Sequence, residues 1–150
     1  MGEIKGMLEG KIIELKPKKI FSYEEIAELL PIVLRITKQY SDRVNQLVQK
    51  LENISSNEKL VSESEAEIND LIQEWQIKME KLGAHTKGLW IADFDSGNGY
   101  FCWKYPEAQI LYWHGYRDGF SGRRPVKEYL NSKQDSRDES GSSPDQHTHL

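Results

Sequence analysis

Apolar side chains recur at helical spacing through the central part of the chain. In the first stretch they step by threes and fours, at Val33, Ile36, Tyr40, Val44, Leu47, Leu51 and Ile54. The same spacing returns from residue 68 to residue 82, where Gly83, a residue type common just after helix ends, interrupts it. A short polar link joins the two stripes. The pattern therefore predicts two long amphipathic helices packed as an antiparallel hairpin over about residues 31–82.

The expected helix starts are capping boxes, in which a hydroxyl caps a backbone amide and a carboxylate bonds back to the cap. The two candidates are Ser22 with Glu25 and Ser62 with Glu65. Pro31 lies too far from Ser22 to belong to the first turn of that helix. We expect one helix to stop near Leu29 and the hairpin to start at Pro31, with a single kinked helix as the alternative.

After Gly83 the spacing changes from helical to alternating. The runs "GLWIADF" and "GYFCWKY" flank the turn "DSGNG", and "PEA" separates them from "QILYWH". This pattern predicts a three-stranded meander over about residues 87–114, with "KKIF" before the first helix as a candidate fourth strand. The expected fold class is α+β: a long antiparallel helical hairpin with a small antiparallel three- or four-stranded sheet packed on it.

The C-terminal residues 131–150 contain a single apolar side chain, Leu150, and predict a disordered tail. Residues 1–130 are then one α+β domain, in which a loop rich in glycine and arginine spans residues 115–126. His147 and His149 in the tail are expected to be mobile, although they could catch a metal adventitiously. The charged N-terminal segment shows no apolar run that suits a signal peptide or a membrane span.

Charge and cysteine content narrow the function classes. The chain has 20 basic and 24 acidic side chains, and the resulting net charge of -4 argues against binding to nucleic acid. Cys102 is the one cysteine, so neither an internal disulfide nor a zinc site built from cysteines can form. We expect a reduced, cytoplasmic compartment and no membrane contact. No basic neighbour activates Cys102, which predicts an inert thiol.

The stretch "YWHGYRDGFSGRRP" holds the candidate chemistry. His114 ends the last predicted strand and Asp118 follows in the loop, while Asp93 ends the first strand. Together they could orient an imidazole or share a metal. The alternative is that His114 stacks among neighbouring aromatic rings and Asp118 caps its own turn. The spacing is weak evidence, so we predict no cofactor and leave the metal question open.

Basic side chains on the same loop suit an anion. Arg123 and Arg124 follow three glycines whose backbone amides can turn toward one point, and a guanidinium beside them can receive a carboxylate or phosphate. Alternatively, Arg123 pairs with Asp93, Glu24 or Glu25 and pins the loop to the domain. Arg124 is then surface charge.

Three tryptophans lie on successive predicted strands: Trp90, Trp103 and Trp113. If the register brings two of them to one face, they form a platform for a ring, a proline-rich peptide or the helices. Core packing is the favoured interpretation, because a small sheet needs large side chains to bury enough area. Trp113 stays a candidate ligand-binding residue as part of such a platform.

The order of these segments resembles a known family. "KIFSYEEIAELLP", a helical hairpin, "GLWIADF", "YFCWKY", "ILYWH" and "GFSGRRP" are similar to an uncharacterised prokaryotic family, domain of unknown function 2203, over about residues 19 to 126. The C-terminal motif is the specific part. The chain departs from the family pattern at Gly115, where an acid often follows the histidine, and at Asp95, where a proline often follows "DF". The family has no established activity, so the resemblance implies a fold and not a function.

Two functions remain. The first is a small cytoplasmic binding or adaptor protein, which meets a protein partner or a second copy and carries an anion or ligand site at the loop. The alternative is a hydrolase-like enzyme with His114 as general acid or base, Asp118 or Asp93 orienting it, and Arg123 holding an anionic substrate. The two differ in whether His114, Asp118 and Arg123 line one concave pocket.

Overall fold

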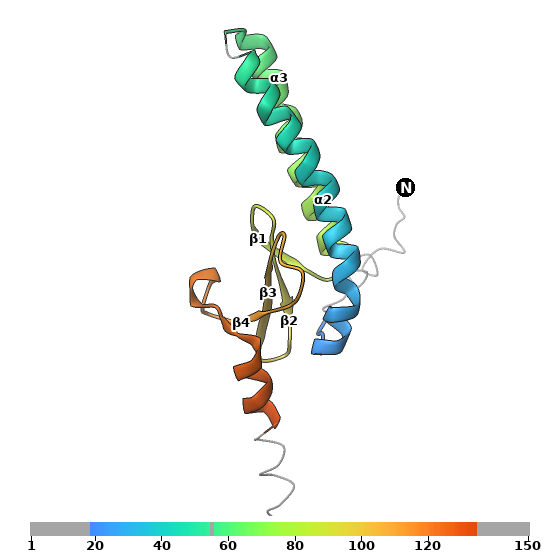
Figure 1. Cartoon of the computed structure of the whole chain (residues 1–150), viewed down its shortest axis with the longest axis vertical. Helices are drawn as coiled ribbons and strands as arrows, with labels where there is room; N and C mark the ends of the chain where they lie inside the picture. The colour runs from blue at the N-terminus through green and yellow to red at the C-terminus, as the bar shows by residue number, and fades with distance from the viewer. Residues whose placement is uncertain (1–18, 55, 135–150) are drawn as a thin grey trace, which may run out of the picture.

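A computed structural model describes residues 19–54 and 56–134 of the chain (Figure 1). Two long helices lie side by side and project well beyond a five-stranded antiparallel sheet. The predicted α+β class and the helical hairpin are confirmed. None of the described helices is long and apolar enough to cross a membrane.

The first described helix, α2, spans Tyr23–Asn53 and begins at the predicted capping box. The Glu25 amide donates to Ser22 Oγ at 3.0 Å, and the Ser22 amide donates to the Glu25 carboxylate at 2.8 Å. The expected stop near Leu29 is wrong, because Pro31 lies inside α2. The buried stripe of the helix continues on both sides of the exposed proline, so tertiary packing offsets the lost backbone hydrogen bond.

The second helix, α3, spans Glu58–Lys81 and starts before the predicted capping box. Asn57 is the N-cap, and its side chain accepts a hydrogen bond from the Leu60 amide at 3.2 Å. Ser62 and Glu65 therefore lie inside the helix, and the prediction of a start there is wrong. Asparagine caps as well as serine does, and this earlier cap adds a further turn to α3.

The core of the hairpin contains the stripe residues predicted for it. The buried ones include Val33, Val44, Leu71, Trp75 and Met79, while Ile36 and Leu47 are partly buried against them. A buried hydrogen bond also joins the helices: Trp75 Nε1 donates to Thr37 Oγ1 at 2.9 Å.

Within the described part of the chain the sheet has five strands in the order of the chain, not the expected three or four. They are β1 His85–Gly88, β2 Ile91–Asp95, β3 Gly99–Lys104, β4 Tyr112–Gly115 and β5 Arg124–Pro125. The predicted meander is β2, β3 and β4, and the additional strands are the short edges β1 and β5. The described part of "KKIF" is not a strand, although the Phe21 amide donates one hydrogen bond to Asp95 O.

Helical residues 126–134 follow β5. Residues 131–134 thus belong to a helix rather than to the expected disordered tail. The remaining part of that predicted tail, residues 135–150, lies outside the described residues, as do His147 and His149.

The two faces of the sheet differ in chemistry. The apolar face comprises Ala92, Phe94, Phe101, Trp103 and Trp113. It packs on the start of α2 and on residues 126–134: the Phe21 and Phe94 rings meet at 5.5 Å, and Tyr129 stacks on Trp113 at 4.5 Å. The polar face comprises His85, Asp93, Cys102, Tyr112 and His114, by alternation and register.

The predicted tryptophans serve the core. Trp103 and Trp113 are buried on the apolar face, and Trp90 packs edge-on against Trp75 of α3 at 5.0 Å. Trp90 thereby joins the turn between β1 and β2 to the hairpin.

Candidate functional site

Three buried side chains that can ligate a metal meet at the centre of the polar face. Asp93, Cys102 and His114 come from β2, β3 and β4, with exposed fractions of 2%, 0% and 3%. Asp93 lies directly opposite Cys102 in the sheet, and His114 lies one diagonal step away on the next strand. One potential ligand atom from each lies within 4.8 Å of the other two. We call these residues the Asp-Cys-His cluster.

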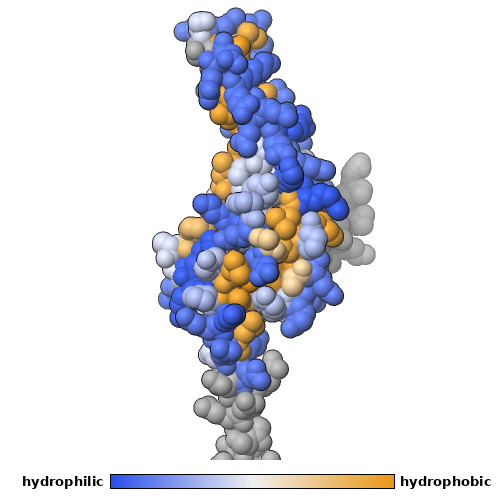
Figure 2. Space-filling model, in the orientation of Figure 1, coloured by the Kyte–Doolittle hydropathy of each residue, from blue (hydrophilic) through white to orange (hydrophobic). Residues whose placement is uncertain are grey.

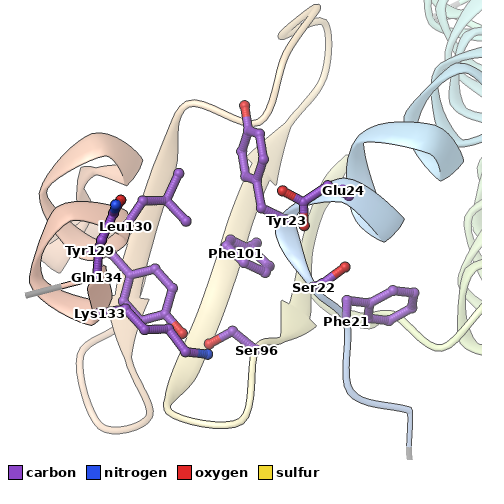
Figure 3. A pocket seen from close by; sticks show the side chains of 10 residues that line it. All are labelled: Phe21, Ser22, Tyr23, Glu24, Ser96, Phe101, Tyr129, Leu130, Lys133 and Gln134. Atoms are coloured by element: carbon purple, nitrogen blue, oxygen red, sulfur yellow. The ribbon is translucent and has the colours of Figure 1, made fainter. Parts of the chain in front are cut away.

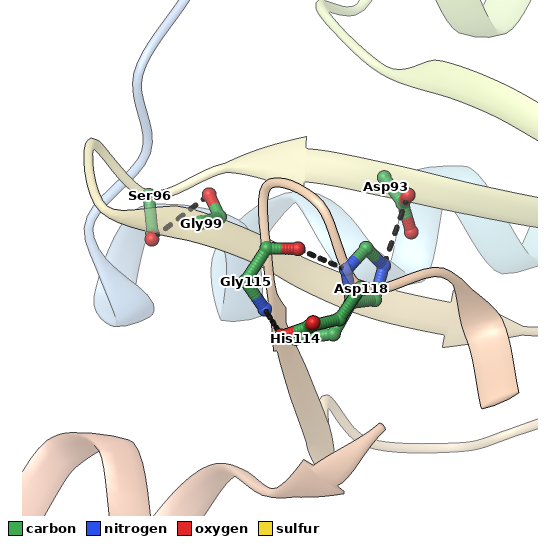
Figure 4. A network of polar contacts seen from close by, with 6 residues as sticks. All are labelled: Asp93, Ser96, Gly99, His114, Gly115 and Asp118. Atoms are coloured by element: carbon green, nitrogen blue, oxygen red, sulfur yellow. Dashed lines mark hydrogen bonds and ion pairs between the residues drawn. The ribbon is translucent and has the colours of Figure 1, made fainter. Parts of the chain in front are cut away.

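Hydrogen bonds hold the imidazole of His114 in place (Figure 4). Its Nδ1 lies 2.8 Å from Gly115 O, and its Nε2 lies 3.1 Å from Asp93 Oδ2. A carbonyl oxygen only accepts hydrogen bonds, so Nδ1 carries a proton and donates it. The ring therefore presents Nε2 to the carboxylate.

The other oxygen of the Asp93 carboxylate is less well satisfied. Oδ1 is buried and has no hydrogen-bond partner in the described structure. Buried polar atoms nearly always have a partner, because leaving one without a partner in the interior costs free energy. Asp93 Oδ1 is therefore the least satisfied polar atom of the cluster.

The Cys102 thiol is not a nucleophile in this setting. Burial, the negative charge of Asp93 and a hydrogen bond from the thiol to the Asp93 carboxylate raise the pKa of the thiol well above its usual range. The expectation of an unreactive thiol thus has a physical cause, and Cys102 still lies beside two other ligand types.

Aromatic side chains adjoin the cluster on the same face of the sheet. The Tyr100 ring lies 5.6 Å from His114 and also meets the rings of Tyr116 and His85. The Tyr116 hydroxyl donates to Asp95 at 2.7 Å, and this bond to a carboxylate raises the pKa of Tyr116 to about 12. Tyr116 and His85 are exposed, so this group of rings extends from His114 to the surface.

The structure brings together only part of the predicted site. Asp93 and His114 meet, but Asp118 does not join them: its carboxylate accepts from the Gly115 amide at 3.2 Å and caps its own turn. Arg123 pairs with Glu107 rather than with Asp93, Glu24 or Glu25. Its guanidinium also stacks over the Tyr112 ring at 3.8 Å.

Two further predicted residues lie away from the cluster. Trp113 is on the apolar face, where its indole donates to Ser96 Oγ at 3.1 Å. The exposed Arg124, its partner across β4 and β5, lies over the Trp113 ring at 5.2 Å.

A pocket of about 330 Å³ opens beside the apolar face (Figure 3). Tyr23 at the start of α2 and Tyr129 flank Phe101 of β3, and Ser96 and Lys133 are also in the lining. Phe101 and Cys102 are neighbours in one strand and point to opposite faces, so this pocket and the cluster are separated by the sheet. None of His114, Asp118 and Arg123 lines it.

Cys102 is the residue that the sequence reasoning did not assign to a site. The hairpin turn around "DSGNG" carried the signal, because a turn centred on Gly97 and Asn98 places Asp93 opposite Cys102. The path of residues 105–111, which sets the register of His114, had no comparable signal.

The sequence matches the family described as Uncharacterized conserved protein (DUF2203) over residues 19–126, and the chain belongs to that family. No curated protein and no solved structure matches the chain. The family assignment thus agrees with the fold and names no activity.

Proposed function

We propose that this member of the DUF2203 family is a cytoplasmic binding protein whose helical hairpin pairs with a second copy of the chain as a coiled coil. The observation that carries the proposal lies in the distal arm, defined as residues 45–54 and 56–68. Buried residues of α2 end at Val44, and among the described residues of the arm Ser64 alone is buried. The single Cys102, which has no disulfide partner, supports a reducing compartment.

Apolar side chains continue along the distal arm although the sheet does not reach it. They are Leu47, Val48, Leu51, Ile54, Leu60, Val61 and Ile68. Val48 and Leu60 are 42% and 39% exposed. Figure 2 shows apolar atoms along the projecting hairpin up to its end. Two helices alone leave such side chains half-covered, whereas a bundle of four would bury them.

Charge favours a second copy as the occupant. From Arg35 to Asn53, α2 has four basic and two acidic side chains, while α3 from Glu58 to Glu74 has six acidic and one basic. In a two-fold pair, α2 of one copy can face α3 of the other, and opposite charges then meet twice. A second copy supplies such a complementary hairpin through its own α2 and α3.

Sedimentation velocity of the full chain at micromolar concentrations tests the proposal. We expect a dimer, and we expect the double variant Val48→Gln, Leu60→Gln to sediment as a folded monomer. Leu89→Gln is the control, because Leu89 is 52% exposed, more than either residue, but lies in the turn between β1 and β2. A monomeric wild type, or a double variant that still dimerises, contradicts pairing through the arm.

The alternative, a hydrolase-like enzyme, has less support. A general acid or base needs a substrate within hydrogen-bond reach. Both ring nitrogens of His114 face groups of the protein itself, Gly115 O and the Asp93 carboxylate, and the ring is almost completely buried. Arg123, which was expected to hold an anionic substrate, forms an ion pair with Glu107 instead.

A further inference from the structure

We propose that Asp93, Cys102 and His114 bind a divalent transition-metal ion, best matched by Zn²⁺, on the polar face of the sheet. This inference does not depend on pairing of the hairpin. It begins with the contact between His114 and Asp93. Nδ1 carries the proton that is donated to Gly115 O. A neutral imidazole has only one such proton, so its Nε2 presents a lone pair.

That lone pair faces another acceptor. Asp93 Oδ2 lies 3.1 Å from Nε2, and an ionised carboxylate only accepts. Two acceptors at this separation need a positive centre near both of them, either a proton or a metal ion. A proton satisfies this one contact but leaves Asp93 Oδ1 without a hydrogen bond of normal geometry, although the Cys102 thiol lies close enough to interact with the same carboxylate.

Cys102 decides in favour of the metal. Its Sγ, a carboxylate oxygen and an imidazole nitrogen all lie within 4.8 Å of one another, which is compact enough for one ion to contact all three. A mixed sulfur, nitrogen and oxygen set suits Zn²⁺ and is unsuited to Mg²⁺ or Ca²⁺. A chain with one cysteine cannot build a zinc site from several cysteines. One cysteine is enough for a site that also uses a histidine and an aspartate.

Charge balance agrees with the burial. On binding, Cys102 loses its thiol proton to solvent, Asp93 supplies a carboxylate, and His114 binds as the neutral ring. The two negative charges offset the charge of the ion, so the buried unit is neutral overall. The bond from Nδ1 to Gly115 O is also the outer contact that orients metal-binding histidines.

The experiment refolds the full chain, because the cluster is buried. Protein is unfolded, stripped with a chelator, refolded with Zn²⁺ and freed of excess ion, and the retained zinc is measured. We expect one equivalent in wild type. Refolding with Co²⁺ should give the sulfur-to-metal charge-transfer absorption of a bound thiolate, and Cys102→Ser should abolish it.

Variants locate the ion. His114→Ala and the near-isosteric Asp93→Asn should each weaken Zn²⁺ binding by more than about 100-fold, the upper end of the effect of losing only an outer contact. His85→Ala removes an exposed histidine of the same face and should bind as wild type does. So should the double variant His147→Ala, His149→Ala, which removes the tail histidines.

Two results would overturn the assignment. If refolded wild type retains no zinc and gives no charge-transfer absorption, the cluster holds a proton instead of a metal. If zinc binding persists in folded Asp93→Asn and is lost with the tail histidines, the ion binds elsewhere. Circular dichroism of each variant establishes that it has folded.

Discussion

The polar face of the sheet and the distal arm differ in what they bury. The sheet encloses Asp93 and His114, which are polar, whereas the arm leaves apolar Val48 and Leu60 in contact with water. Either arrangement is unfavourable for an isolated chain. The comparison teaches where a second component would stabilise the protein: an ion within the sheet and another helical surface along the arm.

The largest effect should come from shortening a side chain in the buried part of the hairpin, which we call the root of the hairpin. Leu71 is buried between the helices, so Leu71→Ala should lower the free energy of unfolding by about 2–5 kcal/mol. Leu60→Ala, the matched change in the distal arm, should cost about 1 kcal/mol or less in the monomer. Urea unfolding of dilute protein measures both. Equal losses would remove the distinction between a packed root and an open arm.

A smaller effect should follow from one added methyl group in the sheet. At Gly99 a Cβ would overlap the Trp113 ring and lie 2.5 Å from His114 O. Gly99→Ala should therefore lower the unfolding free energy by about 1–3 kcal/mol. Gly119→Ala is the control, since a Cβ there meets nothing within 4 Å. Thermal unfolding compares the two, and an unaffected Gly99→Ala would mean that β3 and β4 pack loosely.

The smallest effect concerns the loop arginine. Arg123→Lys should cost about 1 kcal/mol, because lysine loses the planar stack on Tyr112 and the short contact from Nη2 to the Glu107 carboxylate. Exposed Arg117→Lys should cost nothing measurable. If Arg123 is a pin, adding phosphate leaves the amide resonances of residues 119–124 unchanged. Phosphate-dependent shifts that weaken in Arg123→Lys, without a lower melting temperature, would restore the anion site.

Periodicity was sufficient to predict the hairpin and the meander. Apolar stripes spaced by threes and fours predict amphipathic helices that pack on each other. Alternating runs on both sides of "DSGNG" predict a β-hairpin. Helix starts were harder, because Asn57 and Ser62 are both good caps and their choice depends on the turn before them. The helix at residues 126–134 had a signal in the spacing of Val126, Tyr129 and Leu130, which is short and easily missed.

The residues of the candidate site could be predicted only where a short turn sets the pairing of neighbouring strands. Asp93 and His114 were suggested by their strand ends, but Arg123 finds Glu107 through the path of residues 105–111. Nothing in the residue types distinguishes Glu107 from Glu24 or Glu25 as its partner. Such choices depend on how distant segments close around the sheet, which no short-range pattern records.

The buried bond between Thr37 and Trp75 has a consequence for how the hairpin can vary. Sliding one helix by a turn would separate these two polar atoms and leave both buried without a partner, so the bond sets the alignment of α2 with α3. The distal arm lies beyond it toward the loop and projects away from the sheet. Equal insertions of seven residues in both helices within the distal arm would lengthen it and leave the sheet unaltered. The reach of the protein is thus adjustable separately from its interior chemistry.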